Sequence, residues 1–399
     1  MLMMPYFVAQ CFDAFRRDAF GHEGDYRKRP GPVLWYVGFE PMDPLTHFLT
    51  GACLGRAGFN RKAAYATLAM TLAAEAPDLD ILWGLRGPVA GFEHHRGITH
   101  TLIAAPFIAL VTTAVVWLIH RFRVARLRAK PTKAPLRWAL LWCFAFIAVL
   151  SHLLLDFTNN YGIRPFFPFN PRWYSWDIVY IVEPLIIAAL LLALFMPWLF
   201  GLADREMGVK RVLFRGRGWA IAALVFMVLL YAVRNAEHAH AANLVRNANV
   251  TSEPILRVAP QPEPINPFLW YVIIETPDFY QTAVVHTRSD QVDSDPAEDM
   301  IYKPPVTMST LAAKRSPLGR VYLDWSKFPI VEDKGPLTPP GYQVDPPRPD
   351  WHTVEFRDLR FGYSVLTLKP SDLVLTGWDY VGPQQEIEGM FMNGTEQKD

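Results

Sequence analysis

Histidines and carboxylates are scattered through an otherwise apolar stretch of this sequence, between residues 45 and 236. Imidazole nitrogens and carboxylate oxygens are the usual ligands of Zn²⁺ and Mn²⁺. Ionisable groups at membrane depth also tend to mark functional sites, because burying them is costly. The candidates are His47, Asp78, Asp80, His95, His100, His152, Asp156, Asp177 and Glu183. Together they predict a metal centre.

Two short spacings support this prediction, although each has another explanation. His152 and Asp156 are i and i+4, so both side chains share one helix face and can bind one ion. Taken alone, such a pair is more often hydrogen-bonded on a helix surface. Asp78 and Asp80 stand side by side at a helix end in Pro-Asp-Leu-Asp, where an N-cap or turn cluster is the alternative.

The segment 95–100, His-Arg-Gly-Ile-Thr-His, combines two imidazoles with a cation and a glycine. Two histidines five positions apart cannot share a continuous helix face, but a turn at Gly97 can aim both inward. Arg96 has two equally good roles. It can clamp a phosphate oxygen, or it can form a salt bridge with Asp78 or Asp80.

Membrane-spanning helices must position most of these residues. A spanning helix needs roughly 20 mostly apolar residues. Stretches that qualify are residues 101–119, 138–155, 178–200 and 219–236. Two shorter apolar stretches precede them, at 45–54 and 63–76. We expect these two to form a helical hairpin that is re-entrant or packed against the bundle.

Basic residues predict the orientation of the spans. The segments 121–137 and 203–217 are dense in arginine and lysine, so the positive-inside rule places both in the cytoplasm. The aromatic loop between the second and third spans then lies at the outer interface. This argument uses none of the candidate ligands, yet it gathers them at one face of the membrane, together with residues 250–399.

Composition excludes several other classes of function. The chain has 399 residues and a net charge of +1, which gives no support for a nucleic-acid partner. Its three cysteines form no CxxC pair, which argues against a cysteine-ligated zinc and a disulfide framework. The sequence has neither a GxxxxGK[ST] nor a GxGxxG pattern, so nucleotide binding has no support.

The predicted fold is a mainly α membrane protein with four transmembrane helices and a short N-terminal hairpin, followed by a small β-rich domain. Residues 1–41 are expected to be a mis-called extension or a disordered tail, 42–240 the membrane domain, and 250–399 an extracytoplasmic domain. A Pro-rich loop is expected at 326–351. The expected strands are 269–275, 282–287, 319–324, 353–357 and 363–368.

Several motifs resemble those of the YdjM-like family. They are Asp-Pro-Leu-Thr-His at 43–47, Pro-Asp-Leu-Asp at 77–80, His-Arg-Gly-Ile-Thr-His-Thr at 95–101 and Ser-His-Leu-Leu-Leu-Asp at 151–156. The segments 161–173 and 176–184 are also similar, so the resemblance covers about residues 42–200. The family is described as membrane-bound metal-dependent hydrolases. The resemblance therefore implies a divalent metal and hydrolysis, without supplying a substrate.

Roles can be assigned on this basis. One or two ions of Zn²⁺ or Mn²⁺ are expected, a pair lying about 3.5–4 Å apart. His95 and Glu183 are second choices, as ligand or general base. Arg96 would hold a phosphate oxygen, and Asp177 would orient a ligand histidine. The predicted ligands are His47, Asp78, Asp80, His100, His152 and Asp156.

The predicted protein is an inner-membrane, multi-pass hydrolase whose site lies at the outer face and reaches lipid headgroups. A phospholipid or polyprenyl-phosphate ester is the first choice of substrate, with an amide or peptide bond as the other. The alternative function is non-enzymatic, with the His/Asp set holding a structural metal or conducting an ion. A midplane site and inverted repeats, which are typical of transporters, are not visible.

Overall fold

The computed structural model describes residues 43–127, 132, 134–208, 215–336, 350–362 and 375–397. The expected N-terminal extension at 1–41 and the expected strand at 363–368 lie outside the described residues. All the candidate metal-site residues lie inside them.

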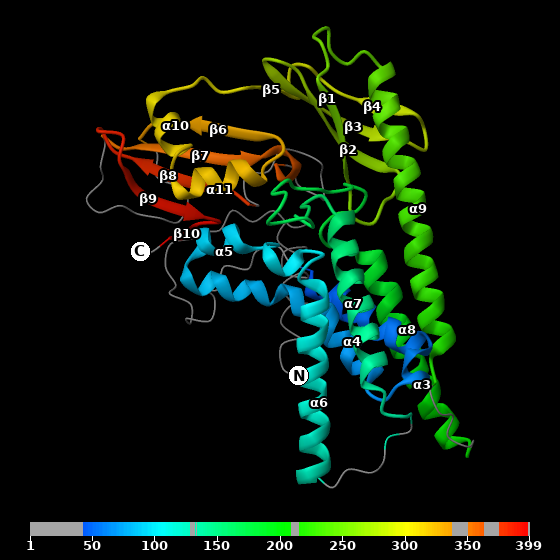
Figure 1. The fold of residues 1–399 in the computed structure, drawn as a ribbon. Coiled ribbons are helices and arrows are strands. Elements are labelled where there is room, and N and C mark those ends of the chain that lie inside the picture. The colour runs from blue at the N-terminus through cyan, green and yellow to red at the C-terminus, as the bar shows by residue number, and fades with distance from the viewer. Residues whose placement is uncertain are drawn as a thin grey trace. The chain divides into compact units, whose positions relative to one another are not determined.

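Four helices among the described residues are long and apolar enough to cross a membrane, which confirms the predicted spans (Figure 1). The third begins at Pro184 instead of residue 178. Proline is favoured at the first position of a helix because its missing N–H is not needed there. The four are α6 (Ala105–Leu127), α7 (Trp138–Thr158), α8 (Pro184–Glu206) and α9 (Arg217–Asn247).

The predicted N-terminal hairpin is present as α2 (Pro44–Leu54) and α4 (Ala66–Glu75). They are joined through η2 (Gly55–Phe59) and α3 (Asn60–Lys62). Two glycines one turn apart let the helices approach closely. A Cβ atom on Gly51 would lie 2.6 Å from the Met70 carbonyl oxygen, and one on Gly55 would lie 2.5 Å from Thr67 Cα. Small residues at this spacing are typical of tightly packed membrane helices.

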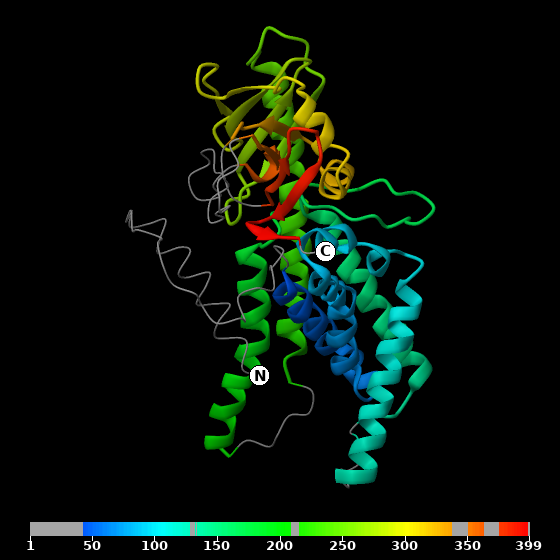
Figure 2. The same ribbon diagram turned by 90° about the vertical axis from the view of Figure 1, so that its left-hand side faces the viewer.

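The hairpin lies between two pairs of spans (Figure 2). Buried alanines of α4 pack against α6 and α7, in one apolar cluster with Leu141 and Val149. Leu49 of α2 packs against α8 and α9, in a second cluster with Ile186 and Ala220. The hairpin thus joins both pairs and fixes the position of the segments that follow it.

After α4 the chain leaves the bundle as a segment that we call the arm, residues 76–94. It consists of η3 (Ala76–Arg86) and α5 (Pro88–His94), which run crosswise to α6 in Figure 1. Gly87, at φ 115°, makes the turn between them. The short helix η4 (Ile98–His100) then leads into α6.

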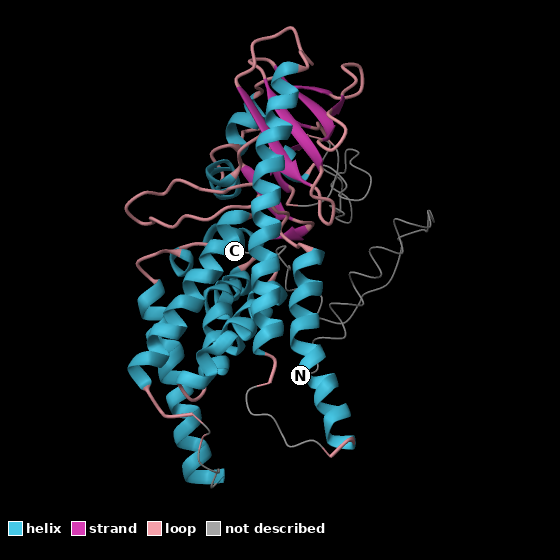
Figure 3. Cartoon of the chain, turned by 90° about the vertical axis from the view of Figure 1, so that its right-hand side faces the viewer, coloured by secondary structure: helices cyan, strands magenta, loops and turns pink. Residues whose placement is uncertain are grey.

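The described residues after α9 form two antiparallel sheets, two short α-helices and the 3₁₀ helix η5 (Leu359–Phe361), here called the β region (Figure 3). The first sheet has the order β1-β2-β3-β4, with β5 on β3, and the second has the order β10-β9-β8-β7-β6. The first sheet's strands are β1 (Arg257–Pro262), β2 (Leu269–Glu275), β3 (Phe279–His286), β4 (Gln291–Asp293) and β5 (Met300–Tyr302). The second sheet's are β6 (Pro329–Asp333), β7 (His352–Asp358), β8 (Gly377–Val381), β9 (Ile387–Met392) and β10 (Thr395–Glu396).

Two sequence predictions in the β region are wrong. Residues 319–324, expected as a strand, belong to the helix α11 (Pro317–Trp325), which follows α10 (Met308–Ala313). The Ser316 hydroxyl caps α11 by accepting from Gly319 N at 2.8 Å. Leu318, Tyr322 and Trp325 are buried at helical spacing. The expected loop at 326–351 also contains the strand β6, which pairs with β7.

The β region and the arm share an apolar core. Phe92 of the arm lies with its ring 5.8 Å from that of Tyr322 and 5.2 Å from that of Trp325. The same cluster includes Tyr161, from the loop after α7. A buried hydrogen bond also joins the β region to the loop after α7, since Arg360 Nη1 donates to the Asn160 carbonyl at 2.8 Å. The cytoplasmic placement of the basic loops stays a prediction.

Candidate metal centre

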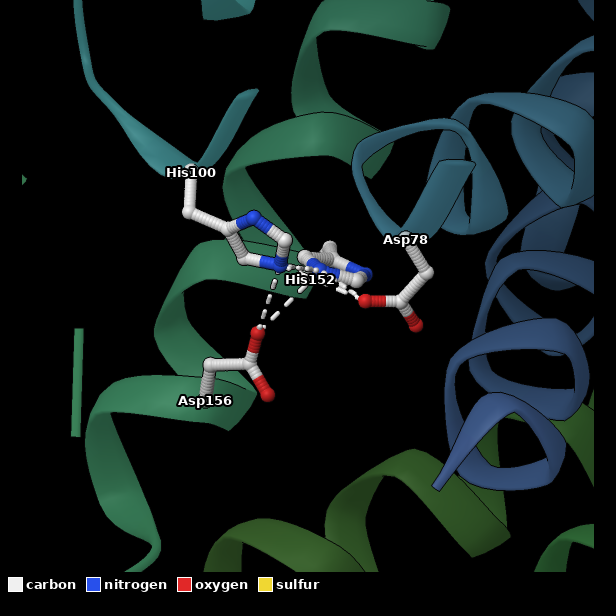
Figure 4. Close-up of side chains that lie close together, drawn as sticks. All are labelled: Asp78, His100, His152 and Asp156. Atoms are coloured by element: carbon white, nitrogen blue, oxygen red, sulfur yellow. Dashed lines mark hydrogen bonds and ion pairs between the residues drawn. The ribbon is translucent and has the colours of Figure 1, made fainter. Parts of the chain in front are cut away.

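Four predicted ligands lie together at the end of the bundle next to the β region, and we call them the donor cluster (Figure 4). Each offers one ligand atom, and these atoms all lie within 4.8 Å of one another. The members of the donor cluster are Asp78, His100, His152 and Asp156. Asp78 comes from the arm, His100 from η4, and the other two from successive turns of α7, as their i, i+4 spacing predicted.

The distances within the donor cluster fit a single cation. His152 Nε2 lies 3.0 Å from His100 Nε2 and 3.1 Å from Asp156 Oδ2. His100 Nε2 lies 3.3 Å from both Asp78 Oδ1 and Asp156 Oδ2. Ligand atoms about 2.0–2.1 Å from a tetrahedral ion lie about 3.3 Å apart, so these four spacings are compatible with a shared cation.

The tautomer of His152 leaves a lone pair directed at the donor cluster. Its Nδ1 lies 2.7 Å from the carbonyl oxygen of Ala74, which can only accept a hydrogen bond. Nδ1 therefore carries the proton, and in the neutral ring Nε2 is bare. A ligand histidine is commonly oriented by such a bond from its other nitrogen.

His100 is oriented in the same way by Asp80. The carboxylate oxygen Oδ2 of Asp80 lies 3.2 Å from His100 Nδ1 and accepts from Arg96 N at 2.8 Å. Its other oxygen lies 3.5 Å from His95 Nδ1. Asp80 and His95 thus lie behind His100, on the side away from the other donors. Asp80 stays a predicted ligand, but its present contacts are those of a carboxylate that positions a ligand.

The two oriented imidazoles give a direct test of whether a cation fits. If both rings are neutral, two bare Nε2 atoms face each other at 3.0 Å, beside carboxylate oxygens that also carry only lone pairs. This arrangement is repulsive unless a positive charge lies among the four atoms. Two imidazoles and two carboxylates are also a suitable ligand set for a divalent ion.

The pKa shifts of His100 and Asp80 are also consistent with positive charge in the donor cluster. Burial lowers the pKa of His100, but Asp156, Asp78 and Asp80 outweigh it and raise that pKa well above its usual value. Burial raises the pKa of Asp80, but His95 and His100 outweigh it and lower that pKa far below its usual value. The surroundings therefore favour positive charge at the cluster and a fully ionised carboxylate behind it.

Arg96 forms a salt bridge, but with a different partner from the ones expected. Its Nη2 lies 2.7 Å from Asp156 Oδ1, and Nη1 donates to Asn159 Oδ1 at 3.1 Å and to the Gly162 carbonyl at 3.0 Å. The side chain is buried, and the ring of Tyr161 lies 4.7 Å from its guanidinium carbon. These contacts hold Oδ1 of Asp156 in place, so that its other oxygen, Oδ2, faces the other members of the donor cluster.

His47 lies beside the donor cluster, next to a small cavity. Its Nε2 is 3.4 Å from Asp156 Oδ1, and its ring centroid is 3.9 Å from that of His152. The cavity has a volume of about 20 Å³ and is lined in part by His47, Asp156, Glu183 and Tyr231. Such a volume suits about one water molecule. The sequence could not show this cavity, because its walls come from four separate helices and loops.

Glu183 lines that cavity but is engaged by an arginine that the sequence analysis did not single out. Its Oε2 lies 2.6 Å from Arg234 Nη2 on α9, and both side chains are buried. Glu183 Oε1 also accepts from Ile265 N of the β region at 3.3 Å. The sequence contains a signal for this pair, because an arginine inside an apolar span, such as Arg234, indicates a charged partner.

Asp177 is not brought to a ligand histidine. Its carboxylate pairs with Lys327 of the β region, with Oδ2 2.9 Å from Nζ, and it also accepts from Ser175 Oγ. The structure therefore gives Asp177 a different contact from the predicted one, joining the aromatic loop to the β region. The partner lysine lies 150 positions away, so no local spacing could have indicated it.

Comparison with known proteins agrees with the architecture and the motifs. The family model described as "YdjM inner membrane protein" matches residues 42–241, a range that contains every candidate site residue. The chain is also 28% identical over 161 residues to YfhP of Bacillus subtilis (strain 168), which is described as an uncharacterized protein. That match covers 38% of this chain and 45% of the relative. No solved structure matches. The resemblance seen in the motifs is thus confirmed, and this chain belongs to the YdjM inner membrane protein family.

Proposed function

We propose that this chain is a membrane-bound, metal-dependent hydrolase whose reaction centre is the donor cluster, at the outer face of the membrane. The observation that carries the proposal is the pair of oriented imidazoles facing two carboxylates at 3.1–3.5 Å. A bound divalent ion would polarise a substrate oxygen and lower the pKa of a coordinated water to near 7. Zn²⁺ and Mn²⁺ both suit these ligands.

The chain's own residues support catalysis over a purely structural metal. A structural site is coordinatively closed, whereas a catalytic site keeps a position for water. The cavity of about 20 Å³ beside Asp156 has room for one water, and His47 and Glu183 are among the residues that line it. Glu183, one of the two predicted general bases, is then positioned to accept a proton from that water. A closed structural site would need no such space.

The proposed substrate class is a lipid phosphoester in the outer leaflet. The candidate spans and the inner membrane protein family support a location in the inner membrane. The aromatic loop at 161–176 supports a headgroup-level site, since exposed Phe166, Phe169 and Trp176 are of the kind found at membrane interfaces. The outer side follows from the basic loops at the opposite helix ends. A site at this depth reaches a headgroup without extracting the lipid.

Metal content tests the ligand assignment. The full-length protein, purified in lipid nanodiscs, is expected to contain one or two divalent ions per chain by inductively coupled plasma mass spectrometry. Asp78→Ala and His152→Ala should each lose most of this metal. His240→Ala is a matched control, because His240 also pairs with a carboxylate, Asp290, at 2.7 Å, but on an exposed surface. Retention of metal by both site variants would remove the assignment.

Activity tests the reaction class. The metal-loaded protein is assayed against bilayers containing phospholipid and polyprenyl-phosphate esters, with release of headgroup or phosphate as the readout. We expect turnover that depends on metal and falls at least 100-fold in His152→Ala, with His240→Ala unchanged. Bound metal without turnover on any ester, with any divalent ion, would favour the non-enzymatic alternative.

A further inference from the structure

The arm presents two different faces. Asp78 and Asp80 of η3 are buried toward the donor cluster. Large apolar side chains between and beyond them are exposed. The exposed fractions are 63% for Leu79, 59% for Leu82, 36% for Trp83 and 75% for Leu85. Single exposed apolar residues are common on proteins, but a group of them on one short segment indicates a contact surface.

Among the described residues, the β region packs on the opposite face of the arm. α5 packs closely on η3, since a Cβ on Gly91 would lie 3.1 Å from Gly84 Cα. Val89 and Phe92 on the far side of α5 are buried in the core shared with α11. The Gln397 side chain also bonds the arm, accepting from Val89 N at 3.0 Å. The exposed leucines of η3 therefore face away from these contacts.

Exposed apolar side chains are also present after the arm, up to and into the candidate span α6. Ile98, Leu102 and Ile103 follow the arm and are 61%, 47% and 48% exposed. Phe107 and Leu110 of α6, a candidate span, are 65% and 56% exposed. Because η3 also lies against η4 and α6, the exposed apolar side chains of the arm and of this candidate span are most simply covered by the same lipid.

The polar edge of the arm also has the chemistry of a membrane interface. Trp83 stacks on His94, with ring centroids 4.0 Å apart, and the Arg86 guanidinium lies over Trp83 at 4.7 Å. Tryptophan and arginine are favoured at headgroup level, because an apolar body can enter the acyl region while a polar or charged end stays hydrated. Helices with one apolar face of this kind lie in the interface plane.

We propose that the arm is an interfacial element, whose leucine face enters the lipid leaflet beside the donor cluster while its α5 face carries the β region. The occupant of this face is the lipid leaflet itself. The consequence for substrate choice rests on the proposed function. Because Asp78 and Leu79 are adjacent on η3, a ligand atom and a lipid contact belong to one short segment. The substrate is therefore a membrane-resident amphiphile that enters from the leaflet.

Site-directed spin labelling tests the contact independently of catalysis. Cys11, Cys53 and Cys143 are replaced by alanine, and single cysteines are introduced as Leu82→Cys and Leu85→Cys. Leu110→Cys on α6 serves as the lipid reference. Val306→Cys, 65% exposed in the β region, serves as the aqueous reference. Labels are read in liposomes for collision with oxygen, which prefers lipid, and with a water-soluble nickel chelate.

We expect the labels at 82 and 85 to collide with the nickel chelate at least threefold less than the label at 306, while oxygen collisions approach those at 110. Nickel accessibility equal to that at 306 would show an aqueous surface and overturn the proposal. Protection from both reagents would indicate a protein partner, such as a second copy, and would overturn it as well. The hydrolase proposal survives either result, and its own failure leaves these readings unchanged.

The substrate consequence has a separate test once turnover is established. Leu82→Glu should lower turnover of a bilayer-resident ester about tenfold and leave turnover of a short-chain, water-soluble ester unchanged. Equal rates of the variant and the parent on the bilayer ester would overturn entry from the leaflet. A matched loss on both esters would overturn it too, because the effect would then lie in the donor cluster.

Discussion

Two buried groups of charges lie at the same end of the bundle, and they are built differently. In the β region, Asp358 and Arg360 form a closed pair, with Arg360 Nη2 2.9 Å and Nε 3.0 Å from the carboxylate. Asp358 Oδ2 also accepts from Ser326 Oγ at 2.5 Å and from Lys327 N at 2.7 Å. In the donor cluster, by contrast, two imidazole nitrogens and two carboxylate oxygens face one another at 3.0–3.5 Å, with no arginine or lysine nitrogen between them.

The Asp358–Arg360 pair has the contacts of a structural ion pair, whereas the donor cluster has the ligand types of a metal site. The Asp358–Arg360 pair is neutral as a unit, and neighbouring groups satisfy its remaining donors and acceptors. The donor cluster has its outer atoms satisfied by Ala74 and Asp80, while its inner atoms gather around one point. A buried site that is held from outside in this way and lined inside by nitrogen and carboxylate ligands could hold a cation.

The largest expected effect comes from breaking the closed pair. Arg360→Met leaves a buried carboxylate without its cation, so we expect a loss of about 3–5 kcal/mol in the free energy of unfolding. Denaturant unfolding of the full chain in detergent measures this. The matched control is Arg357→Met, because Arg357 also pairs with carboxylates but is partly exposed. A change below 1 kcal/mol would mean that the pair is not structural.

Metal removal should have the next largest effect, and it should act on the donor cluster alone. A ligand present at 100 times its Kd stabilises the folded state by about 2.7 kcal/mol, so a chelator should lower the melting temperature measurably. His152→Ala should melt at a temperature that the chelator does not change. Equal shifts in the parent and in His152→Ala would place the metal elsewhere.

Acid should weaken the closed pair. Burial raises the pKa of Asp358, but Arg360 and Ser326 outweigh it and lower that pKa to about 2. Because the folded-state pKa lies below the unfolded value near 3.9, the pair contributes stability above about pH 4. That contribution, about 2 kcal/mol, is lost as the pH falls from about 4 to 2. Unfolding curves of the parent and of Asp358→Asn should converge over this range, and parallel curves would contradict the assignment.

The smallest expected effect concerns Asp80, and it distinguishes a residue that orients His100 from a metal ligand. If this carboxylate orients His100 without binding the metal, Asp80→Asn should retain the site and weaken metal affinity by at least tenfold, about 1.4 kcal/mol. Competition with a fluorescent zinc chelator measures the affinity. A loss as complete as that of Asp78→Ala would instead make Asp80 a ligand, as the sequence predicted.

Local sequence patterns predicted most helices and strands correctly. They were wrong where contacts with distant residues determine the secondary structure. Apolar windows gave the spans and the hairpin, and strand β2 has the bounds predicted for it. Residues 319–324 were misread because Val321 and Tyr322 favour strands, whereas the Ser316 cap and the buried Leu318, Tyr322 and Trp325 impose a helix. Hydrophobic spacing and capping outweighed propensity there.

The candidate site divides in the same way. The convergence of Asp78, His100, His152 and Asp156 followed from helix ends and loop charge, which are properties of whole segments. The partners of individual charges did not follow. Arg96 pairs with Asp156 instead of Asp78 or Asp80, and Asp177 pairs with Lys327. Such choices depend on side-chain directions that only the packed chain fixes.

The bond network of Gln397 has a consequence for the order of assembly. Its side-chain amide accepts a hydrogen bond from Val89 N and donates one to the Arg86 carbonyl, so it bridges the two sides of the turn at Gly87. Val89 and Arg86 are 308 and 311 positions from Gln397, so the ribosome must add all of the residues between them before these bonds can form. The helix that carries Asp78 is then secured after the membrane helices have been inserted. A chain truncated before Gln397 should keep its bundle yet show faster protease cleavage near Gly87.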